Sequence, residues 1–266
     1  MKIVAVIPAR YESTRLPGKP LKDILGRPMI WWVYTRAKSA KKIDEVIVAT
    51  DDNRIKEACE QFCIPVVMTK NTHPTAAHRL QEVSDTVDAD FYIQINGDEP
   101  MIDASVIDAA IPDEVPQDRE FGTNIITEMH DPAQVLDASN IKMVFDNDMN
   151  ALYMSRTPIP YPFKAIDFCY YKHVGILGYN KKMLDFHRDT ERGRFEKIEG
   201  IDSLRFIDYG KQLKLILVSN CETLSVDTEK DLKMVTQMMK ERGFEKHVKD
   251  EKLTPKQDNH YRETLC

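Results

Sequence analysis

From residue 2 to residue 96, short apolar runs alternate with segments of helical periodicity. Four runs are continuous enough to be buried strands, at residues 2–9, 45–52, 66–69 and 91–96. Apolar residues at helical spacing separate them, at residues 29–40, 54–62 and 78–87. Because this alternation with short connections is typical of βαβ units, the sequence predicts an α/β fold with an open, mostly parallel sheet flanked by helices.

The middle of the chain follows a different pattern. Residues 122–220 hold five strand-like pieces, NIITEM, IKMVFD, ALYMS, HVGILGY and KLILVS, around the proline-rich stretch TPIPYP. They predict an antiparallel insertion that covers the substrate and mediates dimerisation. The strand-then-helix pattern returns at 221–248, so this segment is expected to rejoin the α/β part at 1–121. Residues 249–266 are charged and polar without periodicity, which predicts a flexible tail.

The charge balance and the hydropathy pattern exclude several function classes. The 266 residues include 43 acidic side chains against 37 Lys and Arg, whereas proteins that bind nucleic acid usually carry a basic excess. No apolar run approaches the roughly 20 residues that cross a bilayer. Pro8-Ala9-Arg10 interrupts the first apolar run before any signal-peptide cleavage pattern. We therefore expect a cytoplasmic protein that neither binds nucleic acid nor inserts into a membrane.

A basic loop follows the first predicted strand. It places Arg10, Arg15 and Lys19 within ten residues. Guanidinium groups bind phosphate oxygens in pairs and lysine adds a point charge, so the loop suits a polyphosphate. It lacks the GxxxxGK[ST] pattern of a P-loop. A solvated basic loop explains these residues equally well when they are considered alone.

Two aspartates, Asp98 and Asp227, follow apolar strands and should lie at the carboxyl edge of the sheet. Two carboxylates with room for water and phosphate oxygens form a Mg²⁺ site. A single aspartate in such a position is more often a helix cap or a turn residue. The pairing of the two aspartates, opposite the basic loop, favours the metal site.

Ordered blocks of sequence extend over about residues 3 to 240. They include IPARYESTRLPGKPL (7–21), RPMIWWV (27–33), VATDD (48–52), NGDEP (96–100), ALYMSRTPIP (151–160), KHVGILGY (172–179), FEKIEGIDSLRFIDYG (195–210) and SVDTEKDL (225–232). In these blocks the chain resembles the CMP-Kdo synthetases, the 3-deoxy-manno-octulosonate cytidylyltransferases. The resemblance implies an enzyme that transfers CMP from CTP to an acidic sugar with Mg²⁺ and releases pyrophosphate. It also implies that the enzyme is a homodimer.

The resemblance also implies roles for individual residues. The residues expected to act in catalysis are Lys19, Asp98 and Asp227, of which the two aspartates would hold the Mg²⁺. The nucleotide would be bound by Pro8, Ala9, Arg10, Arg15, Lys19 and Arg79. The acceptor would be bound by Asn96, Arg156, His173 and Asp202. The segment 1–121 would thus be the nucleotide-binding part, and 122–220 the acceptor-binding and dimerisation part.

The chain departs from the family pattern at three places on the expected sugar and base wall. Thr75-Ala76-Ala77-His78-Arg79 replaces Ser-Gly-Thr-Asp/Glu-Arg, Asn96 replaces a glutamine, and Asp202-Ser203 replaces Glu-Gln. Because a polar pocket rejects ligands that leave its groups unpaired, we expect the acceptor to differ from ordinary Kdo. It would be an amino-substituted octulosonate or another ulosonic acid.

Several alternatives remain open at this stage. The acceptor could be a smaller carboxylate or phosphonate, or the departures could be neutral changes in an ordinary Kdo enzyme. A non-catalytic nucleotide-binding relative is a further alternative. We interpret His78 as a residue on the exposed face of a helix and not as a contact to an anionic acceptor.

Overall fold

A nine-stranded mixed sheet organises the structure, a computed structural model that describes residues 1–164, 167–219, 221 and 224–245. Its strands are β1 (Ile3–Ala9), β4 (Glu45–Thr50), β5 (Val66–Met68), β6 (Phe91–Ile95), β7 (Gly122–Met129), β8 (Lys142–Phe145), β9 (Ala151–Ser155), β10 (Tyr170–Tyr179) and β11 (Leu213–Leu217). Along the path β11-β7-β10-β6-β1-β4-β5, the described neighbours pair in parallel except around β10. The predicted open, mostly parallel α/β sheet is confirmed.

Helices flank this sheet, and a small ribbon of β2 (Asp23–Ile24) and β3 (Arg27–Pro28) lies beside it. The helices are α1 (Met29–Lys38), α2 (Asn53–Gln61), α3 (Ala76–Ser84), α4 (Ala104–Ala109), α5 (Pro132–Leu136), α6 (Lys181–Asp189), α7 (Arg194–Glu199), α8 (Leu204–Asp208) and α9 (Glu229–Glu241). Of these, α1, α2, α3 and α9 lie where helical periodicity predicted them. Within the described residues, no helix combines the length and the apolarity needed to cross a membrane.

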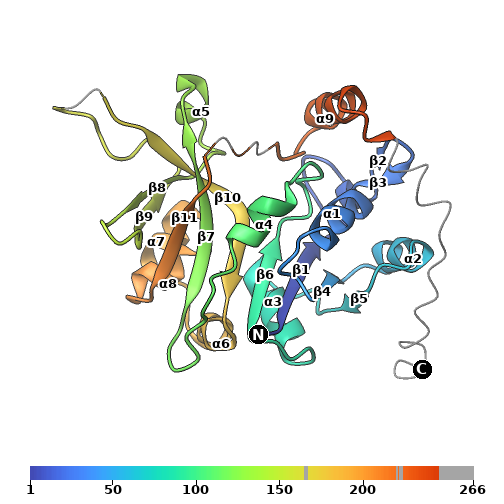
Figure 1. Ribbon diagram of the computed structural model, residues 1–266, viewed down its shortest axis with the longest axis horizontal. Coiled ribbons are helices and arrows are strands. Elements are labelled where there is room, and N and C mark those ends of the chain that lie inside the picture. The colour runs from blue at the N-terminus through green and yellow to red at the C-terminus, as the bar shows by residue number, and fades with distance from the viewer. Residues whose placement is uncertain (165–166, 220, 222–223, 246–266) are drawn as a thin grey trace.

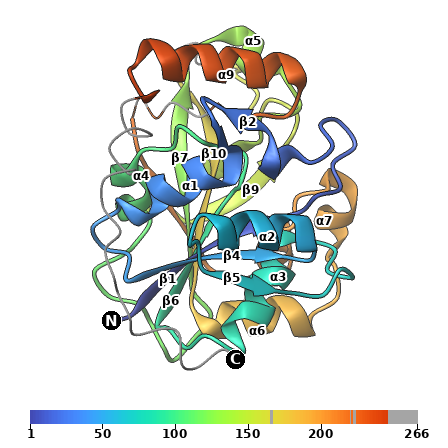
Figure 2. The same cartoon turned by 90° about the vertical axis from the view of Figure 1, so that its right-hand side faces the viewer.

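The two faces of the sheet bury different layers of helices. On β1, Ile3, Ala5 and Ile7 belong to one cluster with residues of α1, α2, α4 and α9. Val4 and Val6 point the other way, into a cluster with residues of α3, α6 and α8. Figure 2 shows α3 and α6 together at the end of the molecule opposite α9. This two-sided burial explains why the β1 sequence is continuously apolar instead of alternating.

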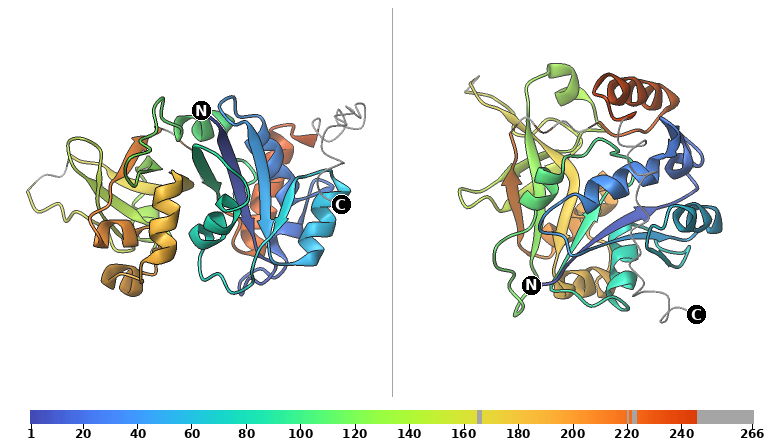
Figure 3. Two further views of the ribbon diagram at one scale, coloured as in Figure 1. Left: turned by 90° about the horizontal axis from the view of Figure 1, so that it is seen from below. Right: turned by 45° about the vertical axis from the view of Figure 1, so that its right-hand side comes forward.

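The chain after residue 121 extends the same sheet. Strand β10 pairs antiparallel with both β6 and β7, while β8 and β9 form an antiparallel pair beside it. Figures 1 and 3 show strands β7 to β11 at the end of the sheet away from α2. The expectation that 214–219 belongs to an antiparallel addition is wrong, because β11 pairs with β7 in parallel. The division of the chain at residue 121 stays a prediction, and the tail predicted at 249–266 lies outside the described residues.

The connection into β11 accounts for its direction. Between β10 and β11 the chain forms α6, α7 and α8, a long crossover that returns it to the end of the sheet where β7 begins. Ile201, between α7 and α8, and Leu204 of α8 belong to one buried cluster with Leu213 and Leu215 of β11. A sequence pattern shows that residues 213–217 form a buried strand, but the direction follows from the crossover.

Candidate functional site

The basic loop after β1 is held in a defined shape by its own backbone. The Gly18 N–H donates a hydrogen bond to the Tyr11 carbonyl over 2.9 Å, which closes the loop. Gly18 has a positive φ of 67°, and an added Cβ would lie 3.2 Å from the Tyr11 ring, so glycine is favoured on both counts. The Arg54 guanidinium covers the Tyr11 ring at 3.3 Å from its centroid. A 3₁₀ turn then begins at Lys19 and directs its side chain toward the sheet edge.

Lys19 lies between the two aspartates that the sequence singled out. Its Nζ is 2.8 Å from Asp98 Oδ2 and 3.0 Å from Asp227 Oδ1. Arg15 Nη2 reaches the same Asp227 oxygen at 3.0 Å. Burial would lower the pKa of Lys19, but the charges and hydrogen bonds of Asp98 and Asp227 outweigh burial and raise it. Lys19 is therefore a stable ammonium group, and residues far apart in the sequence form one charged cluster.

Local structure holds each aspartate in place. The Val226 N–H donates to the Asp98 carbonyl over 2.9 Å, which joins the segment before α9 to the loop after β6. Thr228 caps α9, and Asp231 completes a capping box by accepting from the Thr228 N–H at 2.8 Å. Among the described residues, no donor reaches the buried Oδ1 of Asp98. Carboxylate oxygens are of the kind that a hard divalent cation prefers, and Asp98 Oδ1 is not engaged by a donor from the described residues.

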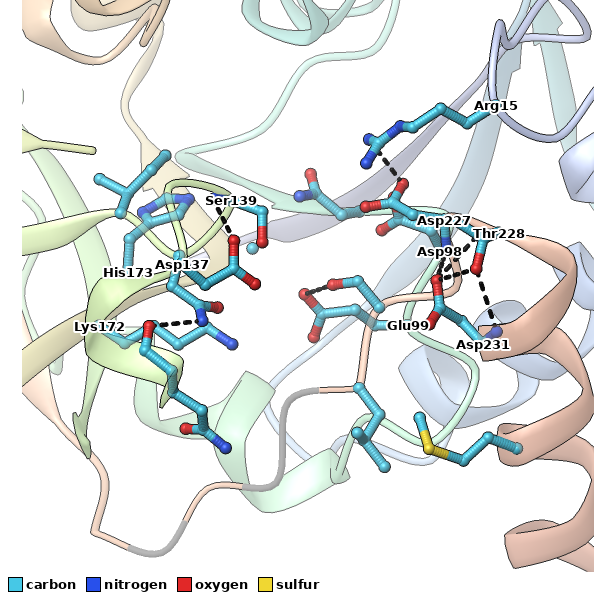
Figure 4. Close-up of a pocket in the computed structure, with 18 residues that line it drawn as sticks. Arg15, Asp98, Glu99, Asp137, Ser139, Lys172, His173, Asp227, Thr228 and Asp231 are labelled. Atoms are coloured by element: carbon cyan, nitrogen blue, oxygen red, sulfur yellow. Dashed lines mark hydrogen bonds and ion pairs between the residues drawn. The ribbon is translucent and has the colours of Figure 1, made fainter. Parts of the chain in front are cut away.

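A cavity of about 510 Å³ opens beside this cluster. Figure 4 shows Arg15, Asp98 and Asp227 on one side of it. The side chains on the opposite wall include Asp137, Ser139, Lys172 and His173. Of the predicted site residues, the cavity brings together Arg15, Asn96, Asp98, His173 and Asp227. Lys19 does not line the cavity but contacts Asp98 and Asp227, which do.

The strands β6 and β10 meet closely at one end of the cavity. The Asn96 N–H donates to the Gly175 carbonyl over 3.0 Å. A Cβ on Gly175 would lie 2.4 Å from Asn96 Nδ2 and 2.9 Å from Glu99 Oε1. Only glycine fits here without moving both side chains, so Gly175 sets the position of two groups that line the cavity.

Glu99 is a cavity residue to which the sequence assigned no role of its own. Its side chain is 5% exposed, and its Oε2 has no hydrogen-bond partner among the described residues. Burial and the neighbouring charge of Asp98 raise the pKa of Glu99 to about 7. The only sequence signal for Glu99 is its place directly after Asp98 in NGDEP. Lys172 also lines the cavity without a predicted role, and its only signal is its place directly before His173.

The other residues predicted to bind the nucleotide form a second group, where Arg79 of α3 packs against the ends of β1 and β4. Arg79 is fully buried, and its Nη2 is 2.8 Å from Asp51 Oδ2. Arg10 donates to the His73 carbonyl, and burial together with the charge of Arg79 lowers the pKa of Arg10. Pro8 and Ala9 end β1 immediately before Arg10. These residues do not line the 510 Å³ cavity, but they share the sheet edge with it.

Two predicted acceptor residues lie away from this cavity. Arg156 donates from Nε to the Glu199 carbonyl over 2.8 Å and from Nη1 to the Ala138 carbonyl over 3.0 Å. Asp202 lies beside Thr75, and burial and the charge of Glu196 raise its pKa. Neither residue lines the cavity. Their part in binding the acceptor stays a prediction.

The interpretation of His78 as a residue on an exposed helix face is wrong. Its ring is half-buried, with Nδ1 2.9 Å from the Thr75 hydroxyl and an edge-to-face contact to His187 at 4.5 Å between centroids. Burial and the charge of Arg205 lower the pKa of His78 to about 4. The helical period placed His78 correctly on α3 but could not show that α6 packs over it. His78 is therefore neutral at physiological pH.

Comparison with known proteins decides the family. Residues 4–224 match the family model described as cytidylyltransferase. The chain belongs to the cytidylyltransferase family. This cytidylyltransferase is 41% identical over 241 residues to the 8-amino-3,8-dideoxy-manno-octulosonate cytidylyltransferase of Shewanella frigidimarina, covering 88% of this chain and 96% of that protein. It is 38% identical to the protein of the same name from Shewanella oneidensis, covering 90% of this chain and 99% of the relative.

Solved structures agree with this assignment. A structure described as CMP:2-keto-3-deoxy-manno-octonic acid synthetase complexed with CTP superposes with a TM-score of 0.85 at 37% identity, covering 91% of this chain and 100% of that one. The inositol-1-phosphate CTP transferase of T. maritima has a TM-score of 0.65 at 13% identity, covering 89% and 94% of the two chains, and shares the fold. The cytidylyltransferase is thus a nucleotidyltransferase enzyme.

Proposed function

We propose that this cytidylyltransferase transfers CMP from CTP to 8-amino-3,8-dideoxy-manno-octulosonate and releases pyrophosphate. The observation that carries the proposal is the cavity beside Lys19, Asp98 and Asp227, which offers groups of both charges to an acceptor. Lys172 suits the acceptor's carboxylate, whereas Glu99 and Asp137 suit a cationic amino group. The octulosonate for which the Shewanella relatives are named carries both groups.

The charged cluster would hold the triphosphate and the metal. Arg15 and Lys19 would bind phosphate oxygens, and Asp98 and Asp227 would hold Mg²⁺, a choice supported by their oxygen ligands. When bound, Mg²⁺ neutralises negative charge at the phosphates. A bond would form between an acceptor hydroxyl oxygen and the α-phosphorus, and the bond from that phosphorus to pyrophosphate would break. The protein would contribute mainly position and electrostatic stabilisation.

The other predicted residues would bind the two ends of the complex. On the nucleotide side these are Pro8, Ala9, Arg10 and Arg79, grouped at the ends of β1 and β4. On the acceptor side they are Asn96, Arg156, His173 and Asp202.

A homodimer that acts in the cytoplasm is also part of the proposal. The strongly exposed rings of Tyr161 (82%) and Phe163 (83%), in the segment after β9, support an interface there.

The acceptor is tested by measuring pyrophosphate release with CTP and Mg²⁺. We expect kcat/KM for 8-amino-3,8-dideoxy-manno-octulosonate to exceed that for 3-deoxy-manno-octulosonate by at least about tenfold, because unpaired acidic groups would disfavour the neutral hydroxyl analogue. Equal or faster turnover of the unsubstituted sugar would refute the proposed acceptor. Absence of turnover with either sugar, while CTP still stabilises the protein to heat, would refute ulosonate transfer altogether.

Gly175→Ala tests whether the close contact of β6 and β10 shapes the acceptor site. The added methyl group would displace Asn96 and Glu99, so kcat/KM for the acceptor should fall by about a hundredfold, as for misplacements near 1 Å. The matched control is Gly210→Ala, where φ is 68° but the added Cβ would meet open space. This control should lower stability slightly and leave kcat/KM unchanged. Wild-type kcat/KM in Gly175→Ala would contradict the prediction.

A further inference from the structure

The wall of the cavity that carries His173 contains an irregularity in strand pairing. His173 of β10 pairs with Ile126 of β7, but four residues later Leu177 pairs with Asn124, only two residues back along β7. Residues 174–176 of β10 therefore lie opposite Ile125 alone. Backbone carbonyls in such a stretch lose their regular partners in the sheet, and buried carbonyls require others.

Asn124 supplies those partners with its side chain. Asn124 is fully buried, and its Nδ2 donates to the carbonyls of Val174 and Ile176, each over 3.0 Å. Its Oδ1 lies 2.7 Å from Nδ1 of His173. Because a carbonyl can only accept, the amide nitrogen must face β10 and the amide oxygen must face the histidine. The orientation of Asn124 is thus set by the backbone.

The orientation of Asn124 determines where the histidine carries its proton. An amide oxygen can only accept, so Nδ1 of His173 must be the protonated nitrogen. Burial, followed by the charge of Lys172, lowers the pKa of His173 to about 4, so the ring is neutral at physiological pH. In the neutral ring Nε2 then has a lone pair and no proton. Within the described part of the chain, no hydrogen bond to Nε2 is present, and His173 lines the cavity.

We propose that Asn124 is a positioning residue that fixes His173 in its Nδ1–H tautomer, so that Nε2 accepts a hydrogen bond from a hydroxyl or ammonium group of the acceptor. This inference rests on the proposed ulosonate acceptor. Because a lone pair at Nε2 repels a carboxylate, His173 would not bind the acid group of the acceptor. His173 therefore selects for a donor group on the sugar and not for its charge.

The tautomer can be measured directly in the protein without substrate. Histidines labelled with ¹⁵N in the ring give separate signals for a protonated and an unprotonated nitrogen, and His173→Gln identifies the signals of His173. We expect a protonated Nδ1 and an unprotonated Nε2 at pH 7. A proton on Nε2, in a neutral or a doubly protonated ring, would overturn the proposal whether or not the enzyme uses an octulosonate.

The acceptor contact is tested by two substitutions of His173. The His173→Gln side chain places an amide near the position of Nε2, whereas that of His173→Asn reaches only the position of Nδ1. We expect the KM for the octulosonate to rise by about three- to tenfold in His173→Asn and less in His173→Gln, the usual effect of losing one hydrogen bond. The KM for CTP should not change. An unchanged octulosonate KM in His173→Asn, or an equal rise in both variants, would contradict the contact.

Asn124→Ser tests the positioning role, and Asn180→Ser is its matched control. Asn180 is also fully buried, and its Nδ2 donates to the carbonyls of Pro116 and Arg119. Both variants should lose stability, but only Asn124→Ser should show mixed His173 tautomers together with a raised octulosonate KM. A wild-type tautomer and KM in Asn124→Ser, or the same changes in Asn180→Ser, would refute the role of Asn124.

Discussion

Replacing Asp98 with asparagine is expected to lower kcat by about a thousandfold, the scale found when a key electrostatic group is removed from an active site. Asparagine has the same shape but lacks the negative charge that would hold the metal. It also leaves Lys19 with one carboxylate partner instead of two. The measurement is pyrophosphate release at saturating CTP, Mg²⁺ and octulosonate.

The matched control for this substitution is Asp103→Asn. Asp103 caps α4 by accepting from the Ser105 N–H at 2.8 Å, and asparagine caps helices equally well. This variant should retain wild-type kcat, and both variants should keep the wild-type circular dichroism spectrum. If Asp98→Asn turned over at a rate near that of the wild type, the assignment of Asp98 to the metal would be wrong.

The largest effect on stability is expected from Arg205→Met. Arg205 and Glu196 are each 1% exposed, and their side chains make two hydrogen bonds, at 2.7 and 2.8 Å. Removing the arginine leaves a buried carboxylate without its main partner, so the free energy of unfolding should fall by about 3–5 kcal/mol. Urea denaturation measures this loss.

A control variant and a pH series distinguish the stability that the buried Arg205–Glu196 pair contributes from that of an exposed ion pair. Arg188→Met removes an exposed arginine from Asp185 and Asp189 and should cost at most about 1 kcal/mol. Burial would raise the pKa of Glu196, but its hydrogen bonds and charge pairing with Arg205 outweigh this and lower it. The pair's contribution is therefore complete above the usual glutamate pKa and lost as the pH falls through the lowered one. A loss in Arg205→Met no larger than in Arg188→Met would contradict the prediction.

The first half of the fold could be predicted because three of its four strands are buried on both faces. Strands β1, β4 and β6 are therefore nearly continuous apolar runs that stand out against the amphipathic helices between them. Helices α5, α7 and α8 have five or six residues each, fewer than two turns, so no helical period could identify them. The place of β10 between β6 and β7 depends on tertiary pairing, which leaves no local mark in the sequence.

The candidate site was predictable where topology alone brings residues together. Asp98 follows β6, so the rule that ligands bind beyond the carboxyl ends of parallel strands correctly placed it at the sheet edge. The strand expected before Asp227 is absent, since residues 224–228 form no strand, and the hydrogen bond from the Val226 N–H to the Asp98 carbonyl holds Asp227 beside Asp98 instead. Asn124 gave no signal, because its importance comes from an irregular pairing that depends on the register of two strands. The pKa of Glu99 depends on burial by elements distant in sequence, so spacing could not reveal it either.

The position of β10 between β6 and β7 affects how the chain folds while it is being synthesised. Strands β6 and β7 precede β10 in the sequence, yet β10 separates them in the sheet. Until residue 179 has been synthesised, β6 and β7 each keep an open edge that only a later segment can occupy. The last central strand to emerge also carries His173 and Gly175. The strand that fills the gap between β6 and β7 therefore also brings His173 and Gly175 to the cavity.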